Sequence, residues 1–330
     1  METITILGGG VAGLALAAAL DPKRWQVTLI EQRPGVPEVG TAFGIWPVAQ
    51  RALAYLGLGD WVAREGISVD SGAIIGPDNE PIVRMRNVDI QLLARPVLLR
   101  ALDGVVPATV QRVAQRVENP RELSGDLVVA ADGARSRVRA SVWGDTARSM
   151  GTWAVRGVLP RPAESPEMGE YWAGHVLFGI SPNTGSTTNW YATVRRDPGP
   201  PAAAIEVLRD THRGFPEPVQ RVLAEMVPER TLVNEILVSP VPKGLVRDRY
   251  VLIGDAAHAM SPSLGRGACE ALVDAVTLGH ELNRRGLDGG VRAYQRQRLL
   301  PAQGVRLAAS AALRLQEAGP KVHRVLAAVG

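Results

Sequence analysis

Three glycines near the N-terminus have the spacing of a loop that binds the phosphates of a dinucleotide. Gly8, Gly10 and Gly13 follow a β-branched, apolar stretch at residues 3–7, which predicts a strand, and open an Ala/Leu-rich stretch at 11–20, which predicts a helix. In such a motif the first glycine makes the turn, the second lets the backbone approach a pyrophosphate, and the third lets helix and strand pack closely. The N-terminus of the helix adds unpaired amides and the positive end of its dipole.

A carboxylate follows where such a unit needs one. Residues 26–31 predict a second strand that ends in Glu31, and a carboxylate there accepts hydrogen bonds from ribose hydroxyls. Strand, glycine turn, helix and strand in this order predict a βαβ unit and a parallel sheet. A βαβ unit without a ligand is the alternative interpretation. The residues predicted to line the dinucleotide are Gly8, Gly10, Val11, Ala12, Gly13, Glu31, Gln32 and Arg33.

Two later segments could also face a ligand. Residues 127–131 predict a buried strand that leads into Asp132 and Gly133. A carboxylate at the C-terminal end of such a strand faces the ligand crevice of an open α/β sheet, although an ordinary turn would use the same Asp-Gly pair. Arg95 begins a predicted helix at residues 95–102, and its residue type alone indicates a solvated arginine at a helix start.

The most informative segment lies in the last third of the chain. Residues 250–254 predict a hydrophobic strand that brings Asp255 to its end, followed by a loop with Pro262 and Gly265 and a long helix that begins near Gly267. The carboxylate can accept hydrogen bonds from a polyol such as a ribityl chain. The N-terminus of the helix can stabilise the negative charge that a reduced flavin develops on its pyrimidine side.

The order of predicted elements indicates a nucleotide-binding domain interrupted by a mostly β lobe. We assign residues 1–67, 91–148 and 244–330 to the α/β domain with its Rossmann-like parallel sheet, and residues 68–90 and 149–243 to a β-rich substrate lobe. Clefts between such parts are where ligands are usually held. Within the second segment of the lobe, strands are predicted at residues 152–159, 175–180, 188–195 and 232–238.

The composition argues against several other kinds of site. The single cysteine, Cys269, excludes an intramolecular disulfide framework and a multi-cysteine metal centre, so we expect no metal and a reducing cytoplasm. The net charge is +4 without a run of five like charges, which gives little support to nucleic-acid binding. Residues 11–20 are apolar but fall far short of the roughly 20 residues that a membrane span needs. We expect a monomer or a homodimer.

Together and in this order, the motifs resemble those of the group A FAD-dependent monooxygenases, the para-hydroxybenzoate hydroxylase-like aromatic hydroxylase family. The resemblance covers nearly the whole chain, although the segment between Arg95 and Asp132 is short for the family. By this resemblance, Arg95 contacts FAD, and the Asp-Gly pair is associated with FAD and with transient NAD(P)H binding. The positions that match the family's motifs are Gly8–Gly13, Glu31, Arg95, Asp132, Gly133, Asp255, Pro262, Gly265 and Gly267.

The resemblance implies a reaction as well as a fold. FAD would be bound, NADPH or NADH would reduce it as a transient co-substrate, and O₂ would then form a flavin hydroperoxide that hydroxylates or epoxidises a small aromatic or apolar substrate. An FAD-dependent reductase or dehydrogenase of the same fold is an alternative, and so is a noncatalytic flavoprotein partner. A halogenase is disfavoured because Trp153 does not begin that class's Trp-x-Trp-x-Ile-Pro pattern.

Substrate-contacting residues are the least defined part of the prediction. Arg156 could bind an anionic or phenolate-like group, or it could be an arginine on the surface of the lobe. Trp190 and Tyr191 are neighbours in a predicted strand, so they point to opposite faces and only one of them can face the cleft. His258 is expected to fix its loop by a hydrogen bond, and Cys269 to be inert packing on the following helix.

Overall fold

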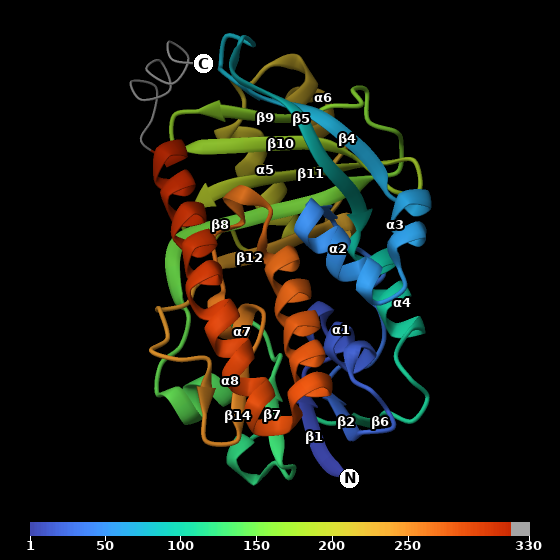
Figure 1. Cartoon of the computed structure of the whole chain (residues 1–330). Coiled ribbons are helices and arrows are strands. Elements are labelled where there is room, and N and C mark those ends of the chain that lie inside the picture. The colour runs from blue at the N-terminus through green and yellow to red at the C-terminus, as the bar shows by residue number, and fades with distance from the viewer. Residues whose placement is uncertain (318–330) are drawn as a thin grey trace.

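The computed structural model describes residues 1–317 and contains two β-sheets with helices around them (Figure 1). The six-stranded sheet has the order β13-β14-β7-β1-β2-β6, and its pairs are parallel except for β13 with β14. Its strands are β1 (Glu2–Leu7), β2 (Trp25–Glu31), β6 (Gln111–Ala114), β7 (Leu127–Ala130), β13 (Val246–Arg247) and β14 (Tyr250–Leu252). The predicted βαβ unit with its parallel sheet is therefore confirmed.

The eight-stranded sheet has the order β12-β8-β11-β10-β9-β4-β5-β3 and is antiparallel except for the pair of β4 with β9. The predicted strands of the lobe are confirmed, whereas the pattern of residues does not predict β3 or β9. The strands are β3 (Ala42–Ile45), β4 (Ile67–Ile75), β5 (Pro81–Ala94), β8 (Arg148–Leu159), β9 (Met168–Ala173), β10 (Val176–Asn183), β11 (Thr187–Arg195) and β12 (Thr231–Val238).

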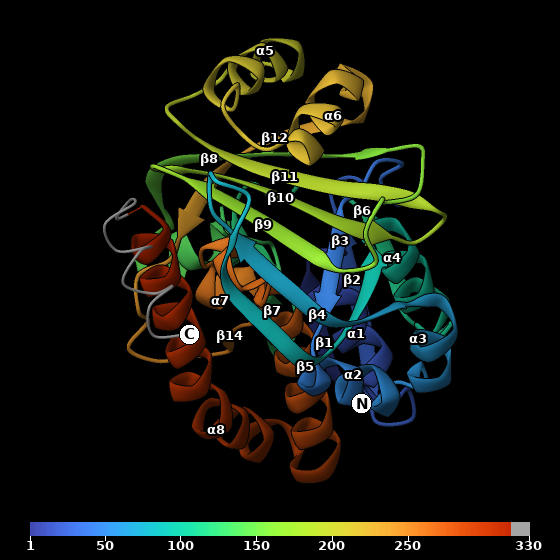
Figure 2. The ribbon, with the colours of Figure 1, turned by 90° about the horizontal axis from the view of Figure 1, so that it is seen from above.

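The helices divide between the two sheets. Figure 2 shows α5 and α6 on one face of the eight-stranded sheet, while its other face is turned toward the six-stranded sheet and its helices. Among residues 1–317, no helix combines the length and apolar character needed to cross a membrane. The helices are α1 (Val11–Ala19), α2 (Pro47–Tyr55), α3 (Gly59–Glu65), α4 (Arg95–Gly104), α5 (Pro201–Thr211), α6 (Glu217–Glu225), α7 (Asp255–His258) and α8 (Gly267–Glu317).

Helix α8 consists of two arms. Gly286 has a φ of 71°, which breaks the helix, and in Figure 1 the second arm turns back toward the lobe. The first arm packs tightly on α1: a Cβ added at Gly279 would lie only 2.6 Å from the Cβ of Ala19. Small residues thus let the two helices approach beside the parallel sheet.

A buried arginine ties the two sheets together. Arg139 is 1% exposed and lies in the helical turn Arg139–Trp143. Its guanidinium donates to the carbonyls of Ala256 and Ala257 in α7, at 3.1 and 2.7 Å, and to that of Pro240, at 2.7 Å, where the chain has just left β12. It also forms an ion pair with Asp145. Arg139 therefore joins the α7 loop to the chain segment that returns from the lobe.

We predict that Arg139→Met lowers the free energy of unfolding by about 3 kcal/mol, because three buried carbonyls and Asp145 lose their donor. The matched control is Arg135→Met, since the Arg135 side chain is 75% exposed and its one ion pair within residues 1–317 is with Glu235. For this control we expect a loss below about 1 kcal/mol. Urea denaturation followed by circular dichroism measures both values, and equal losses would contradict the structural role given to Arg139.

Candidate functional site

The glycine turn after β1 combines two tightly packed positions with one open position. Gly8 has a φ of 111°, and an added Cβ would lie 2.2 Å from the carbonyl oxygen of Ala131. A Cβ at Gly13 would lie 1.8 Å from the carbonyl oxygen of Gly8. At Gly10, by contrast, an added Cβ meets no atom within 4 Å. The first and third glycines are thus required by the packing of the protein itself, while the second borders open space at the N-terminus of α1.

Glu31 is held in place by backbone amides. Its Oε2 accepts from the amide of Gly9 at 2.7 Å, and its Oε1 accepts from the amide of Arg33 at 2.8 Å. Each carboxylate oxygen keeps a further lone pair for another donor. A Cβ at Gly9 would come within 3.1 Å of the Glu31 side chain, so the close approach favours glycine here. The predicted ligand residues Val11 and Ala12 begin α1, and the side chains of Gln32 and Arg33 are exposed beyond β2.

Asp132 has one paired oxygen and one unpaired oxygen. Its Oδ2 accepts from the amides of Arg137 and Val138, at 2.8 and 3.3 Å, and so caps the turn that follows Gly133. Its Oδ1 is buried and has no hydrogen-bond partner within residues 1–317. Burial raises the pKa of this carboxyl group above its ordinary value. Gly133 itself has a φ of 80°, which favours glycine.

The Gly254–Asp255 segment presents a free carboxylate. Gly254 has a φ of 58°, and a Cβ there would lie 3.0 Å from that of Ala12, so the turn packs directly on α1. Asp255 starts α7, is exposed, and makes no side-chain hydrogen bond within the described part of the chain. The N-terminus of α8 is close, because a Cβ at Gly267 would lie 3.9 Å from Oδ1 of Asp255. The turn Pro262–Leu264 and Gly265, with a φ of 60°, connect the two helices.

A buried network of charges fixes this segment. Oδ2 of Asp274 accepts from the amide of Gly254 at 2.9 Å and binds Nε2 of His258 at 2.6 Å, while its Oδ1 accepts from Nε of Arg298 at 2.6 Å. Burial disfavours the charged form of each group, but their mutual attraction outweighs it, so the pKa of His258 is raised and that of Asp274 is lowered. The expected loop-fixing hydrogen bond of His258 is thereby confirmed.

The pattern of residues does not predict that Asp274, Glu270 and Arg298 belong to this network. Arg298 also donates to Oε2 of Glu270 at 2.6 Å. The available signal is that Glu270 and Asp274 stand four residues apart in an otherwise apolar stretch of helix, and so share one face. Cys269, next to them, is buried; its thiol donates to the carbonyl of Gly44 at 3.2 Å, and burial raises its pKa to about 11. Such a thiol is unreactive.

Arg156 of the lobe lies within electrostatic range of two residues of the cofactor motifs, Arg95 and Asp255. Arg95 begins α4 and is exposed, and its amide donates to the carbonyl of Thr41 at 3.0 Å. Arg156, on β8, donates to Oδ1 of Asn234 at 2.9 Å, and its buried Nε has no partner within residues 1–317. Burial and the nearby Arg95 lower the pKa of Arg156, whereas Asp255 raises it. The charges of Arg95 in α4 and Asp255 in α7 thus both act on Arg156 in β8.

The structure also separates Trp190 from Tyr191. Trp190 is 1% exposed and stacks on Phe178, with 6.1 Å between the ring centroids, in the core under α5 and α6. Trp190 is therefore a core residue and not the aromatic residue of the cleft, because its side of β11 is covered by helices. Tyr191 points to the opposite face and is paired in register with Arg156.

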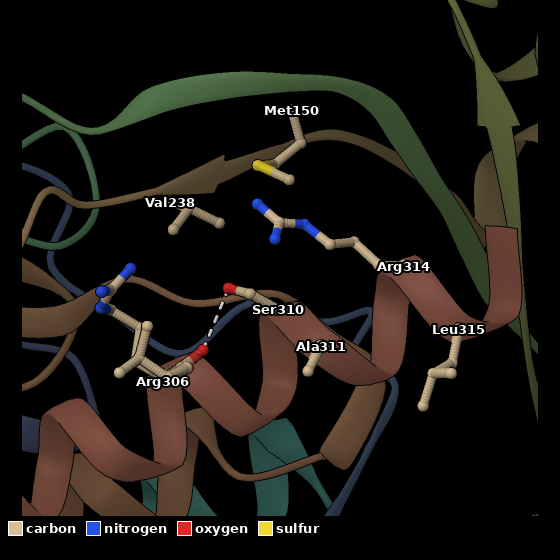
Figure 3. A pocket seen from close by; sticks show the side chains of 8 residues that line it. Met150, Val238, Arg306, Ser310, Ala311, Arg314 and Leu315 are labelled. Carbon is tan, nitrogen blue, oxygen red and sulfur yellow. Dashed lines mark hydrogen bonds between the residues drawn. The ribbon is translucent and has the colours of Figure 1, made fainter. Parts of the chain in front are cut away.

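A separate groove of about 480 Å³ lies between the second arm of α8 and the strands β8 and β12. Figure 3 shows the Arg314 side chain reaching toward Met150 and Val238 there. None of its lining residues belongs to the cofactor motifs, so this groove is not part of the candidate cofactor site. The lining residues are Met150, Val238, Arg306, Leu307, Ser310, Ala311, Arg314 and Leu315.

Comparison with known proteins agrees with this geometry. The family described as "FAD binding domain" matches residues 85–306. The aurachin C monooxygenase/isomerase of Stigmatella aurantiaca is 30% identical, over 90% of this chain and 85% of its own length. The 3-amino-4-hydroxybenzoate 2-monooxygenase of Streptomyces cremeus is also 30% identical, over 90% of this chain and 83% of its own length.

A solved structure shows the same fold. The Klebsiella pneumoniae HpxO, complexed with FAD and uric acid, superimposes with a TM-score of 0.86 at 23% identity, over 99% of this chain and 92% of the other. The resemblance noted from the motifs is therefore confirmed, and the relatives favour an oxygenase over a reductase or a noncatalytic partner. The chain belongs to the FAD-binding-domain family of group A flavoprotein monooxygenases, and it is an FAD-dependent monooxygenase.

Proposed function

We propose that the three motifs hold FAD between the parallel sheet and the lobe, and that the enzyme uses NADPH or NADH and O₂ to hydroxylate a small aromatic compound. The observation that supports this proposal is that the glycine turn leaves open space at Gly10, at the N-terminus of α1 and beside the fixed carboxylate of Glu31. Epoxidation of the substrate is the alternative outcome of the same oxygen transfer. A monomer or a homodimer in a reducing cytoplasm is part of the proposal, and the single cysteine supports that compartment.

The residues present fit a dinucleotide. The open space at Gly10 and the amides at the start of α1 suit a pyrophosphate, and the fixed carboxylate of Glu31 suits ribose hydroxyls. Asp255 has a free carboxylate for the ribityl hydroxyls, and the unpaired Oδ1 of Asp132 lies at the end of the neighbouring strand β7. When bound, FAD supplies the electron transfer and the activation of oxygen.

The other predicted cofactor and substrate residues have defined roles in this proposal. Gly265 and Gly267 shape the turn that leads into α8, whose N-terminal dipole would stabilise the negative charge of a reduced flavin held there. Arg95 would contact FAD from α4, and Gly133 would allow close approach. Arg156 would donate to an oxyanion or a carbonyl of the substrate, and the eight-stranded sheet would exclude water from it.

The relatives support an aromatic substrate without identifying it. Their printed names include a hydroxybenzoate, a quinolone and urate. The direct test is to purify the protein, record the flavin spectrum and then measure NADPH and NADH oxidation with a panel of hydroxybenzoates, quinolones and purines. We expect a yellow protein whose oxidation of one nucleotide is stimulated by a panel member that gains 16 mass units, the mass of one oxygen atom. A protein that cannot take up FAD would refute the proposal.

We predict that Gly10→Ala weakens FAD binding at least about tenfold, the equivalent of 1.4 kcal/mol, without unfolding the protein. The added methyl group meets no protein atom but enters the space given to the pyrophosphate. Gly104→Ala is the matched control, because a Cβ there is equally free and Gly104 lies at the far end of α4. Quenching of FAD fluorescence measures affinity, and thermal melting of the FAD-free protein checks the fold. Equal affinity in both variants would contradict the assignment.

We predict a similar loss, about tenfold or more, for Asp255→Asn, because a charged acceptor contributes roughly 1.5–3 kcal/mol to a hydrogen bond. Asp248→Asn is the control: this exposed acid precedes β14 and has a φ of 51°, a conformation that asparagine also adopts. The same FAD titration measures both variants. If Asp255→Asn binds FAD as the unchanged protein does, the ribityl role is wrong.

A further inference from the structure

Four residues form a row across the face of the eight-stranded sheet that is turned toward the cofactor motifs. Arg156 on β8 pairs with Tyr191 on β11, Tyr191 pairs with Gly179 on β10, and Gly179 pairs with Glu170 on β9. Directly paired residues point to the same side of a sheet. The row is therefore on the face of the sheet that carries Arg156, opposite the core under α5 and α6. On that face the charges of Arg95 and Asp255 act on Arg156.

Gly179 allows the row to become one connected unit. A Cβ at this position would lie 2.0 Å from Cζ of Tyr191, so the tyrosine ring occupies the place of the missing side chain. Because neighbouring strands are about 4.8 Å apart, the ring must cross β10 to reach a residue on β9. It does so, and its hydroxyl donates to Oε2 of Glu170 at 2.8 Å.

Glu170 accepts hydrogen bonds at both of its carboxylate oxygens. Oε1 of Glu170 accepts from Nε1 of Trp172 at 2.5 Å, and an indole nitrogen can only donate. Burial raises the pKa of Glu170 above its ordinary value, and the hydrogen bonds from Trp172 and Tyr191 oppose this rise because they stabilise the carboxylate. Burial and this carboxylate raise the pKa of Tyr191 well above its ordinary value. The hydroxyl hydrogen of Tyr191 is thus committed to Glu170, and only its lone pairs remain for a ligand.

Tyr191 and Arg156 therefore offer a ligand a hydrogen-bond acceptor and a hydrogen-bond donor at paired positions of neighbouring strands. The arginine has a buried Nε without a partner in the described part of the chain, and it can only donate. The tyrosine can only accept while Glu170 holds its hydrogen. Both side chains keep some exposed surface although they lie deep in the molecule.

We propose that Tyr191 and Arg156 select the substrate by its pattern of donors and acceptors. The fitting compound is a small aromatic ring with an N–H or O–H group that donates to Tyr191 and a carbonyl or oxyanion that accepts from Arg156. Gly179 and Glu170 are positioning residues, because they act through Tyr191. This inference rests on the proposed function and narrows its substrate class.

The variant Glu170→Gln gives the sharpest test, because it should reverse the polarity of Tyr191. The indole of Trp172 can only donate, so the amide oxygen of the glutamine must face it, and the amide NH₂ must face Tyr191. Tyr191 then accepts from the glutamine and turns its own hydrogen toward the ligand. A merely structural role of Glu170 would not produce such a reversal.

The experiment uses the FAD-loaded protein and two matched pairs of probes: 4(1H)-quinolone with 1-methyl-4-quinolone, and 4-hydroxybenzoate with 4-methoxybenzoate. Within each pair only the donor hydrogen is replaced by a methyl group. Changes in flavin absorbance give the dissociation constants. For the unchanged protein we expect the donor compound of at least one pair to bind about tenfold more tightly than its methylated partner.

The variants separate specificity from stability. In Glu170→Gln the preference should disappear or reverse, and Tyr191→Phe and Gly179→Ala should also lose it, the latter without removing any polar group. Tyr171→Phe is the control, because Tyr171 neighbours Glu170 on β9 but packs in the core under α5 and α6, and it should keep the preference. Thermal melting confirms that each variant is folded.

Each other outcome has a defined meaning. If methylated and unmethylated probes bind equally, if no probe binds, or if Glu170→Gln keeps the original preference, the inference is overturned, while uptake of FAD and NAD(P)H oxidation leave the proposed function intact. A protein that takes up no FAD overturns the proposed function, and with it the inference. Spectra and NAD(P)H oxidation recorded before the titrations therefore distinguish the two failures.

Discussion

One buried carboxylate holds together the elements that form the cofactor side of the site. Asp274 is fully buried, and an ion in that position costs several kcal/mol unless its partners compensate. Here both oxygens are occupied, by the amide of Gly254, by His258 and by Arg298. Since Gly254 is the residue that turns the chain from β14 into α7, Asp274 also determines where the free carboxylate of Asp255 is presented.

The same network reaches further than a single loop. Arg298 lies on the second arm of α8 and binds Glu270 on the first arm, so it holds the two arms together. Glu270 also pairs with Arg266, whose guanidinium lies 5.5 Å from the ring centroid of Trp46. Positive and negative side chains thus alternate from Arg298 through Glu270 to Arg266, which lies over Trp46 in the segment after β3. Both oxygens of Asp274 and both oxygens of Glu270 therefore have partners, which holds these elements in place before a ligand binds, as an orienting site needs.

Local patterns in the sequence predicted the cofactor motifs because their geometry is local. The turn at Gly8, Gly10 and Gly13 depends on residues a few positions apart, and the apolar strand before Asp255 signals its own end. The buried Arg139 gave no such signal, and the signal of the Asp274 network was limited to the four-residue spacing of Glu270 and Asp274. Arg139 meets carbonyls 117 and 118 residues away, and Asp274 meets Arg298 across the fold of α8, so their residue types alone indicate solvated charges.

The substrate side shows a different limit of sequence reasoning. Alternation along a strand correctly placed Trp190 and Tyr191 on opposite faces, but it could not say which face was covered by helices, because α5 and α6 were not predicted. The link from Tyr191 to Glu170 needed more still. It depends on the pairing of three strands, and its key residue is Gly179, a position where the side chain is absent.

Two neighbouring residues of strand β11 therefore have different roles, one in the stability of the lobe and the other in the selection of the substrate. Trp190 fills the core under the helices, while Tyr191 lies across Gly179 toward Glu170. Because side chains alternate along a strand, a shift of one residue in the pairing of β11 would exchange the two faces and expose the tryptophan. The hydrophobic burial of Trp190 thus fixes the register that aims Tyr191. The polar row can consist of a few hydrogen bonds because the apolar face of the same strand provides the free energy that holds it in place.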